Sequence, residues 1–254
     1  GGFVEVSGKQ YLAFRGTVNT LAPYGKTGTL LLDPTNITIL DGSGNGAGDG
    51  DALTTRFTGV GGGGIGTVLS GSTGPTTIYE SEIEGIAATT NIGVQASNSI
   101  TINALTDGNL NLAQTSGRSV TFFAGGAGGF VMADTSNTIT TNGGTLNITS
   151  AGGAATIGNL ATHGGLLTIN VAAASSVAGV ISGAGGLTKK GAGTLSLSQT
   201  DNTYTGATTI TAGVLSVSKL ANGGSNSGIG ASSNDVHNTR AGEQRVGHRY
   251  GNVL

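Results

Sequence analysis

The chain has 254 residues, enough for one large or two ordinary domains, and a formal net charge of −2. Only 9% of its residues are charged, against roughly 25% in ordinary globular domains, and it contains 49 glycines, 3 prolines and no cysteine. The weak charge gives no electrostatic basis for binding nucleic acid or an anionic membrane, and no apolar run approaches the roughly 20 residues that span a bilayer. The high glycine content argues against long helices.

Short strands with alternating apolar and polar residues are predicted in residues 1–40, because alternation places the apolar side chains on one face of a strand. The predicted strands are Phe3–Ser7, Tyr11–Arg15, Thr29–Asp33 and Asn36–Leu40. A disordered linker is the alternative for a chain so rich in glycine, serine, threonine and asparagine. A linker has no reason to repeat Leu-x-Leu or Ile-x-Ile, so strands are favoured.

The same N-terminal residues carry a family resemblance. The elements GGFVEVSG, then G-x-V, then GTLLLDPTNITI resemble a segment of the large filamentous-haemagglutinin-like exoproteins of Gram-negative bacteria. The resemblance covers about forty residues. It implies that these strands are rungs of a right-handed parallel β-helix.

Residues 41–75 form a glycine-rich insertion that contains a possible calcium loop. Asp41, Asn45, Asp49 and Asp51 could supply oxygen ligands from a flexible loop. The insertion does not keep the nonapeptide register of calcium-binding β-roll repeats, so a solvated loop is favoured.

Acidic residues alternate just after the insertion. If Tyr79–Glu84 is extended, the carboxylates of Glu80, Glu82 and Glu84 lie on one face. They could form a cation site or a glycosidase-like acid pair. Like charges on one face repel when they lose water, so a solvent-facing edge is favoured.

Residues 86–182 contain short strands at regular, close spacing, separated by Gly, Asn, Ser or Asp. Examples are Ser99–Asn103, Asn109–Ala113, Ser119–Ala124, Asn137–Thr141, Thr145–Thr149 and Leu166–Val171. A β-sandwich would show similar spacing. A recurring unit, G-x-L-x-[L/I/V], instead favours a solenoid with three strands per rung and roughly 20 to 30 residues in each rung. The unit begins at Gly28, Gly108, Gly144, Gly165, Gly193 and Gly213, and from Gly144 onward each unit is interpreted as one rung after the last.

A second resemblance lies in residues 183–219, which contain GGLTK, G-x-GTL-x-L, NTYTG-x-T-T-I and AG-x-L-x-V. Together with the following turn they are similar to the autotransporter-associated β-strand repeat. The resemblance implies β-helix rungs in a secreted passenger region and a link to passage through the outer membrane. Nothing in that family's pattern is catalytic.

The last residues, 236–254, have a different character. They hold three of the six arginines and two of the three histidines, and no strand alternation. We expect a frame-shifted or disordered tail that begins near Asp235. A basic peptide with a binding role is the alternative.

No catalytic, cofactor-binding or metal-binding residues are predicted. His163 stands alone, His237 and His248 lie in the tail, and no G-x-S-x-G nucleophile turn is present. Two matches to phosphate-binding loops, at residues 25–27 and 59–64, are rejected because the spacing or the following helix is missing. A β-helix polysaccharide-degrading enzyme stays as the alternative, because scattered acids could gather in space. These acids are Glu5, Asp33, Asp107, Asp134 and Asp201.

The sequence therefore predicts an all-β protein with a right-handed parallel β-helix and glycine-rich loops. The expected segments are 1–40 (haemagglutinin-like rungs), 41–75 (insertion), 76–182 (rungs), 183–235 (autotransporter repeat) and 236–254 (tail). The expected function is a non-enzymatic, adhesin-like passenger fragment, secreted or displayed on the surface of a Gram-negative bacterium. Its expected partners are an outer-membrane β-barrel translocator and host or neighbouring-cell surface glycans or proteins, without nucleic acid and without a cofactor.

Overall fold

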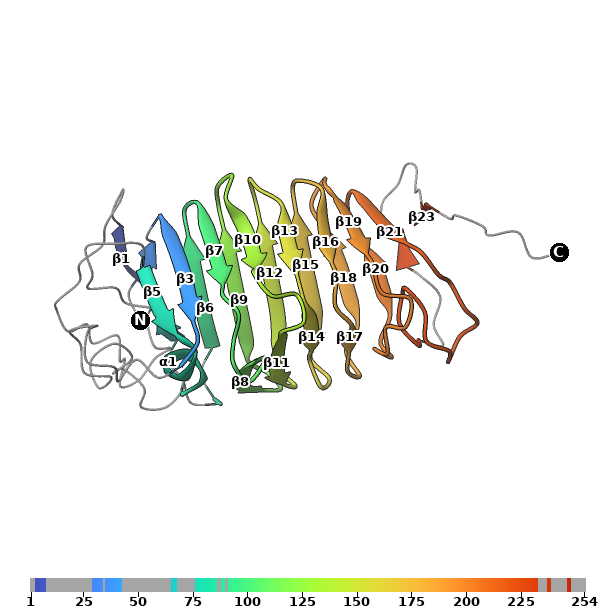
Figure 1. Cartoon of the computed structure of the whole chain (residues 1–254), viewed down its shortest axis with the longest axis horizontal. Coiled ribbons are helices and arrows are strands. Elements are labelled where there is room, and N and C mark those ends of the chain that lie inside the picture. Colours follow the sequence, from blue (N-terminus) through green and yellow to red (C-terminus); the bar gives the residue numbers. More distant parts are fainter. Residues whose placement is uncertain are drawn as a thin grey trace.

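The protein is an elongated stack of short parallel strands (Figure 1). The computed structural model describes residues 3–7, 29–33, 35–42, 65–67, 76–85, 88–89, 91–232, 237–238 and 246–247. Within these residues every pairing between named strands is parallel. The chain folds as a parallel β-helix, as the sequence predicted.

Three sheets run along the stack. The nine-stranded sheet contains, in spatial order, β23 (Val246–Gly247), β21 (Val214–Val217), β19 (Thr194–Leu197), β16 (Ser175–Val177), β13 (Ala155–Ile157), β10 (Gly129–Met132), β7 (Ser99–Ile102), β3 (Asn36–Leu40) and β5 (Thr76–Tyr79). The eight-stranded sheet contains β22 (His237–Asn238), β20 (Thr208–Ile210), β18 (Leu187–Lys190), β15 (Leu167–Val171), β12 (Thr145–Ser150), β9 (Ser119–Ala124), β6 (Asn91–Ala96) and β4 (Ile65–Thr67). The four-stranded sheet contains β17 (Ile181–Ser182), β14 (Asn159–Ala161), β11 (Thr138–Asn142) and β8 (Asn109–Thr115). A separate pair is formed by β1 (Phe3–Ser7) and β2 (Thr29–Asp33), and the described residues include one short helix, α1 (Glu80–Glu84).

From β6 to β17 each rung takes one strand from each sheet in turn, whereas the rungs of β18 and β19 and of β20 and β21 have no strand in the four-stranded sheet. The chain passes through β12, β13 and β14, and then repeats the circuit in β15, β16 and β17. The number of residues between paired positions in the eight-stranded sheet gives the length of a rung. Leu146 pairs with Leu167, and Leu167 pairs with Leu187, so the later rungs lie at the short end of the range expected for solenoid repeats. Earlier rungs are longer, as the wider separation of their paired residues shows: Ile92 pairs with Val120, and Val120 pairs with Leu146. The prediction of three strands per rung is confirmed for the rungs from β6 to β17, and the two rungs that follow have two strands each.

One part of the repeat interpretation is wrong. Gly165 precedes β15 of the eight-stranded sheet, whereas Gly193 precedes β19 of the nine-stranded sheet. The predicted step from Gly165 to Gly193 therefore joins two different corners of the solenoid and is not one rung. The G-x-L-x-[L/I/V] unit occurs at both corners, because each corner begins a strand with the same inward and outward alternation.

The core is a set of columns of inward side chains. One column of paired inner positions along the eight-stranded sheet contains Val94, Phe122, Ile148, Ile169, Lys189 and Ile210. All its apolar members are buried, and the rings of Phe122 and Phe130 meet at a centroid distance of 5.5 Å. Burying each such aliphatic side chain stabilises the fold by about 1.5–3 kcal/mol.

Most of the predicted strands are confirmed. Those with the predicted bounds are Phe3–Ser7, Thr29–Asp33, Asn36–Leu40 and Ser119–Ala124. Those whose ends shift by one or two positions are Ser99–Asn103, Asn109–Ala113, Asn137–Thr141, Thr145–Thr149 and Leu166–Val171. The predicted strand Tyr11–Arg15 lies outside the described residues.

The N-terminal rungs do not follow the order of the chain. In the nine-stranded sheet β3 lies between β5 and β7, although β5 comes after β3 in the sequence. Ile37 pairs with Ile100 on one side and with Thr76 on the other. The strand β5 thus lies on the outer side of β3, and the strand order becomes regular from β6 onward.

Candidate functional site: the C-terminal rungs

A buried lysine lies in the core of the C-terminal rungs. Lys189, on β18, faces inward between Ile169 of the preceding rung and Ile210 of the following one. Its side chain is 0% exposed. The Nζ atom donates to the carbonyl oxygens of Lys190 (2.7 Å), Gly191 (2.8 Å) and Ala212 (3.2 Å). Burial lowers the pKa of Lys189 to about 8.

Two stacked turns supply these carbonyl groups. Gly191 and Gly213 have φ angles of 78° and 69°, which glycine adopts without steric cost. A Cβ added to Gly213 would lie 2.5 Å from the carbonyl oxygen of Gly193, which leaves no room for a side chain. The AG and G-x-G elements of the repeat therefore bring two turns close enough to surround one ammonium group.

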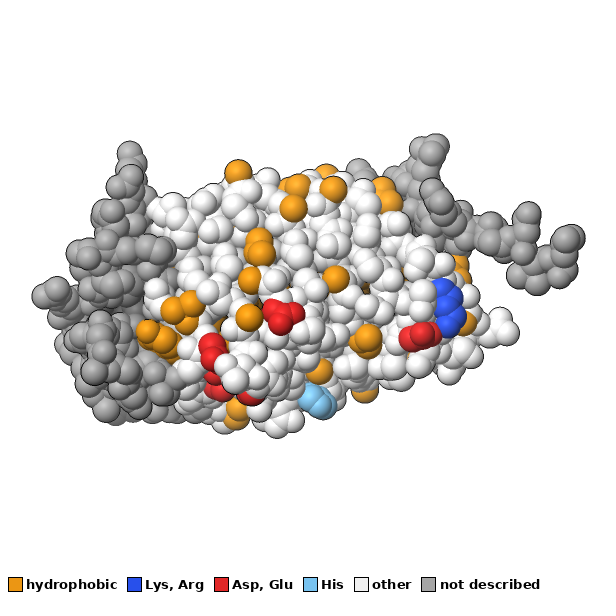
Figure 2. All heavy atoms as spheres, in the orientation of Figure 1, with side chains coloured by type: hydrophobic (Ala, Val, Ile, Leu, Met, Phe, Trp, Pro, Cys, Tyr) orange, Lys and Arg blue, Asp and Glu red, His pale blue; other side chains and the backbone are white. Residues whose placement is uncertain are grey.

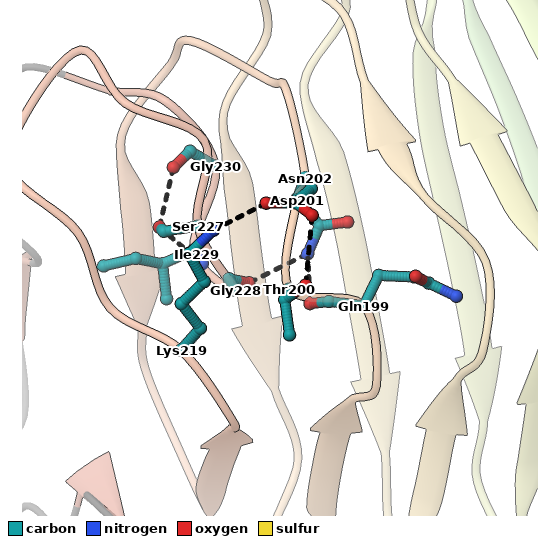
Figure 3. A network of polar contacts seen from close by, with 9 residues as sticks. All are labelled: Gln199, Thr200, Asp201, Asn202, Lys219, Ser227, Gly228, Ile229 and Gly230. Atoms are coloured by element: carbon teal, nitrogen blue, oxygen red, sulfur yellow. Dashed lines mark hydrogen bonds and ion pairs between the residues drawn. The ribbon is translucent and has the colours of Figure 1, made fainter. Parts of the chain in front are cut away.

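Asn202 joins three segments of chain near the end of the four-stranded sheet. Figure 3 shows its contact with Gly228. Its Oδ1 atom accepts a hydrogen bond from the Ile181 amide (2.8 Å), and its Nδ2 atom donates to the Gly228 carbonyl (3.0 Å). Its own amide donates to the Ser227 carbonyl (3.0 Å). Because Asn202 is 1% exposed, these bonds replace water for buried backbone groups.

An exposed ion pair lies beside this network. Lys219 donates to Asp201 at 2.7 Å, with side-chain exposures of 43% and 62% (Figure 3). The hydrogen bond from Lys219 lowers the pKa of Asp201, with a further contribution from Thr200. Exposed ion pairs of this kind contribute little to stability. We therefore assign this pair no more than a minor structural role in the loop.

Tyr204 is buried beside the Asn202 network. It is 1% exposed, and its hydroxyl group shares a hydrogen bond of 2.6 Å with Thr208. Burial raises the pKa of Tyr204 above its usual range. The Tyr204 carbonyl accepts a bond from the Ala231 amide. The phenol group is therefore a neutral packing element.

Glycines form a column at the corner before the eight-stranded sheet. The column contains Gly144, Gly165, Gly185 and Gly206. A Cβ on Gly165 or on Gly185 would overlap the carbonyl oxygen of the glycine one rung before, and one on Gly206 would lie 2.7 Å from that of Gly185. The glycines of GGLTK and NTYTG are thus required by the close approach of successive rungs.

The acidic stretch near the N-terminus does not form the predicted extended face. Residues 80–84 fold as α1 instead, and the two described carboxylates separate. Glu80 accepts the Gly42 amide at 3.0 Å, and Glu84 accepts the Asn111 amide at 2.6 Å. Burial is the largest cause of the raised pKa of each glutamate, and Asp107 adds repulsion. The extended interpretation is wrong because Glu84 finds a backbone donor on the edge strand β8.

Folding does gather acids that are distant in the sequence. Asp41 accepts hydrogen bonds from the amide and hydroxyl groups of Thr106, which lower its pKa. Asp41, Glu80, Glu84 and Asp107 lie around the same end of the solenoid. Among the described residues no three His, Cys, Asp or Glu side chains are placed to hold a metal ion. Asp41, Glu80 and Glu84 each bind backbone amides, a structural role.

The remaining predicted residues are dispersed. His163 occupies a turn with φ 51°, and its Nδ1 lies 2.8 Å from the Thr141 carbonyl oxygen. Asp134 caps its own turn by accepting hydrogen bonds from the amide and hydroxyl of Ser136. The side chains of His237, Glu5 and Asp33 lie outside the described residues. So do His248 and most of the insertion, with Asn45, Asp49 and Asp51, and nearly all of the tail.

Sequence reasoning overlooked Lys189 and Asn202. The signal for Lys189 was present, because alternation in Leu187–Lys190 places Leu187 and Lys189 on the same inward face. No local signal marks Asn202, since its partners Ile181 and Gly228 lie one rung away on either side. No helix among the described residues is long and apolar enough to cross a membrane.

Comparison with known protein families finds a match in the same rungs. Residues 187–217 match the family described as Passenger-associated-transport-repeat. Over 50 residues the chain is 52% identical to the Adhesin BmaC autotransporter of Brucella suis biovar 1 (strain 1330), a match that covers 20% of this chain and 2% of that protein. No solved structure matches the chain.

Both matches support an autotransporter passenger fragment, secreted or on the outer surface of a Gram-negative bacterium. The predicted autotransporter repeat is thus confirmed, and the enzyme alternative receives no support. The chain spans about 2% of the length of the curated relative that it matches. The N-terminal resemblance to haemagglutinin-like exoproteins is matched by neither comparison and stays a prediction.

Proposed function

We propose that this chain is a stalk segment of an adhesin-like passenger, and that it has no catalytic role. The observation that carries the proposal is the transport repeat of residues 187–217, which is folded into consecutive β-helix rungs. In those rungs the polar groups with unusual surroundings, Lys189, Asn202 and Tyr204, all bind other parts of the same chain. They hold the rungs together and present no reactive atom to a substrate.

The proposed partners follow from this role. An outer-membrane β-barrel translocator would carry the passenger to the cell surface, and stacked rungs would then hold the binding loops away from the cell. We place binding to host or neighbouring-cell glycans or proteins in the loops, with the insertion of residues 41–75 as the first candidate. The face shown in Figure 2 has few charged side chains among the described residues, which favours neutral ligands over strongly charged ones.

Binding of the full chain to cell surfaces tests the adhesin proposal. The labelled chain would be applied to glycan arrays, matrix proteins and cultured cells, beside a variant in which residues 43–64 are replaced by a short Gly-Ser linker. Saturable binding that the linker variant loses is expected. Absence of binding to every surface would overturn the adhesive role. Cleavage of acidic polysaccharides by the chain would restore the enzyme alternative.

Export is tested separately. The chain would be fused upstream of an outer-membrane β-barrel in a Gram-negative host, with and without residues 187–217. The amount reaching the surface, measured by digestion of intact cells with an added protease, is expected to fall when the repeat is absent. Equal surface amounts would contradict the proposed contribution of the repeat to export.

A further inference from the structure

Lys189 depends on the rung that follows it. An ammonium group has three N–H donors, and all three are used here. Two acceptors, Lys190 and Gly191, belong to the end of β18 and the turn that follows it. The third, Ala212, lies in the turn between β20 and β21 of the next rung. Full pairing of the buried charge therefore requires the next rung to be in place.

Among the described residues no opposite charge replaces the missing water around Lys189. The strands on either side, β15 and β20, carry no charged residue, and neither does β19 nor the turns at 191–193 and 211–213. Lys190 follows on the outer face, and the Tyr204 hydroxyl is bound to Thr208. Burial is accordingly the cause of the lowered pKa of Lys189.

The apolar pattern alone would permit a slipped rung. In the observed register Leu187, Thr188 and Lys189 pair with Thr208, Thr209 and Ile210. A slip by two positions keeps the inward face inward. It would place Ile210 against Leu187 and Ala212 against Lys189, both acceptable to a hydrophobic core.

We propose that Lys189 is a register lock, which admits the next rung only in the alignment that brings the Ala212 carbonyl to its ammonium group. The Nζ atom lies at the turn of Gly191, and in the observed register the Ala212 carbonyl lies at the same turn. In a slipped rung Ala212 shifts along the strand, its carbonyl moves away from the Nζ atom, and the ammonium group is buried with an unpaired donor. Such a buried charge without full pairing is strongly unfavourable. The inference concerns assembly of the rungs and does not depend on what the passenger binds.

Cysteine pairs can report the register, because the chain has no cysteine of its own. Thr188→Cys with Thr209→Cys reports the observed register, since these residues are paired on the outer face. Thr188→Cys with Thr211→Cys reports a slip by two positions. Adjacent strands are about 4.8 Å apart, which suits a disulfide for paired residues and not for residues two positions out of register.

Each full-length pair would be refolded and oxidised in three backgrounds: Lys189, Lys189→Met, and Ile169→Met as the control one rung earlier in the same column. We expect the slip reporter to stay reduced with Lys189 and with Ile169→Met, and to oxidise at least several-fold more with Lys189→Met. Equal oxidation of the slip reporter in all backgrounds would overturn the lock. If the pair Thr188→Cys with Thr209→Cys stayed reduced in all three backgrounds, the lock would also be overturned, because the assigned register would then be wrong.

A pH readout keeps the test decisive if Lys189→Met refolds poorly. The pKa of Lys189 is lowered in the folded state, so between about 8 and 10.5 the unfolded chain binds more protons, and stability rises with pH. The melting temperature of the wild type should therefore rise across this range relative to Lys189→Gln or Lys189→Met. A difference that does not change with pH would contradict the buried, carbonyl-bound ammonium on which the lock rests.

Discussion

At the scale of single residues, close backbone approach decides which positions tolerate change. The corner before the eight-stranded sheet has glycines in register, and each lacks room for a Cβ because of the carbonyl one rung earlier. Gly93 on β6 is different, since nothing lies within 4 Å of a Cβ there. Gly185 and Gly93 thus have opposite constraints: the first has no space for a side chain, and the second has space and is restricted only by its backbone conformation.

Gly185→Ala should therefore destabilise the protein, whereas Gly93→Ala should not. Overpacking at Gly185 is expected to cost about 1–3 kcal/mol, which lowers the melting temperature by several degrees. Gly93→Ala should leave it unchanged or raise it slightly, because alanine restricts the unfolded chain. Thermal unfolding followed by circular dichroism measures both. Equal melting temperatures for the two variants would contradict the glycine column.

The network around Asn202 gives a second pair of variants. Asn202→Ala removes the acceptor for the buried Ile181 amide and the donor to Gly228, at a cost of about 1–3 kcal/mol. Asp201→Asn removes the neighbouring exposed ion pair with Lys219 and should change the melting temperature little. If Asp201→Asn proved the more damaging of the two, the loop would be held by charge rather than by buried hydrogen bonds.

At the scale of elements, α1 protects a sheet edge. The strand β8 ends the four-stranded sheet, and an unpaired edge invites pairing with another chain. Glu84 accepts the Asn111 amide, and the Ala88 carbonyl accepts that of Thr115. The helix and the segment after it therefore occupy hydrogen-bonding positions that another strand would otherwise use.

Glu84→Gln tests the electrostatic cost of this cap. Burial raises the pKa of Glu84 in the fold, so its contribution to stability is present at low pH and decreases as the pH rises through the raised value. The amide oxygen of Gln can still accept the Asn111 hydrogen bond. The variant should melt a few degrees above the wild type at neutral pH, and the difference should shrink on acidification.

Asp134→Asn provides the opposite sign for comparison. Hydrogen bonds from Ser136 lower the pKa of Asp134, so its ionised form stabilises the fold above the normal pKa, and this is lost in acid. This variant should melt below the wild type at neutral pH and match it at low pH. The same pH trend for both variants would show that a global effect, and not the local contacts, governs the titration.

Particular elements show how far the sequence could predict this fold. Ser119–Ala124 was predicted with its bounds because its alternating residues define a buried face. The strands β14, β16 and β17 are too short for alternation to show. ESEIE has the pattern of a strand, and only the distant β8 edge gives its glutamate a partner that favours the helix. The order of β3 and β5 is likewise set by contacts far apart in the sequence.

At the scale of the whole molecule, stability comes from stacking and not from charge. The charged side chains visible in Figure 2 are few, and apart from Lys189 the core column that contains it is apolar. Each rung gains its stability from its neighbours, as in other solenoids. The melting temperature should therefore change little between about 0.05 and about 1 M sodium chloride, since screening acts on exposed charges. A steep loss of stability with salt would contradict this account.

The shortening of the rungs toward the C-terminal end has a mechanical consequence. A rung adds about 4.8 Å to the height of the stack, yet a short rung such as the one from Leu167 to Leu187 would stretch to about 70 Å once pulled free. Under tension such a tether would yield in discrete steps and dissipate work at each one, with increments of about 90–100 Å for the longer N-terminal rungs. Single-molecule extension should resolve the two step sizes. In the proposed stalk, this would slow an attached cell gradually under fluid shear, because each rung that unfolds lengthens the chain before the next rung bears the load.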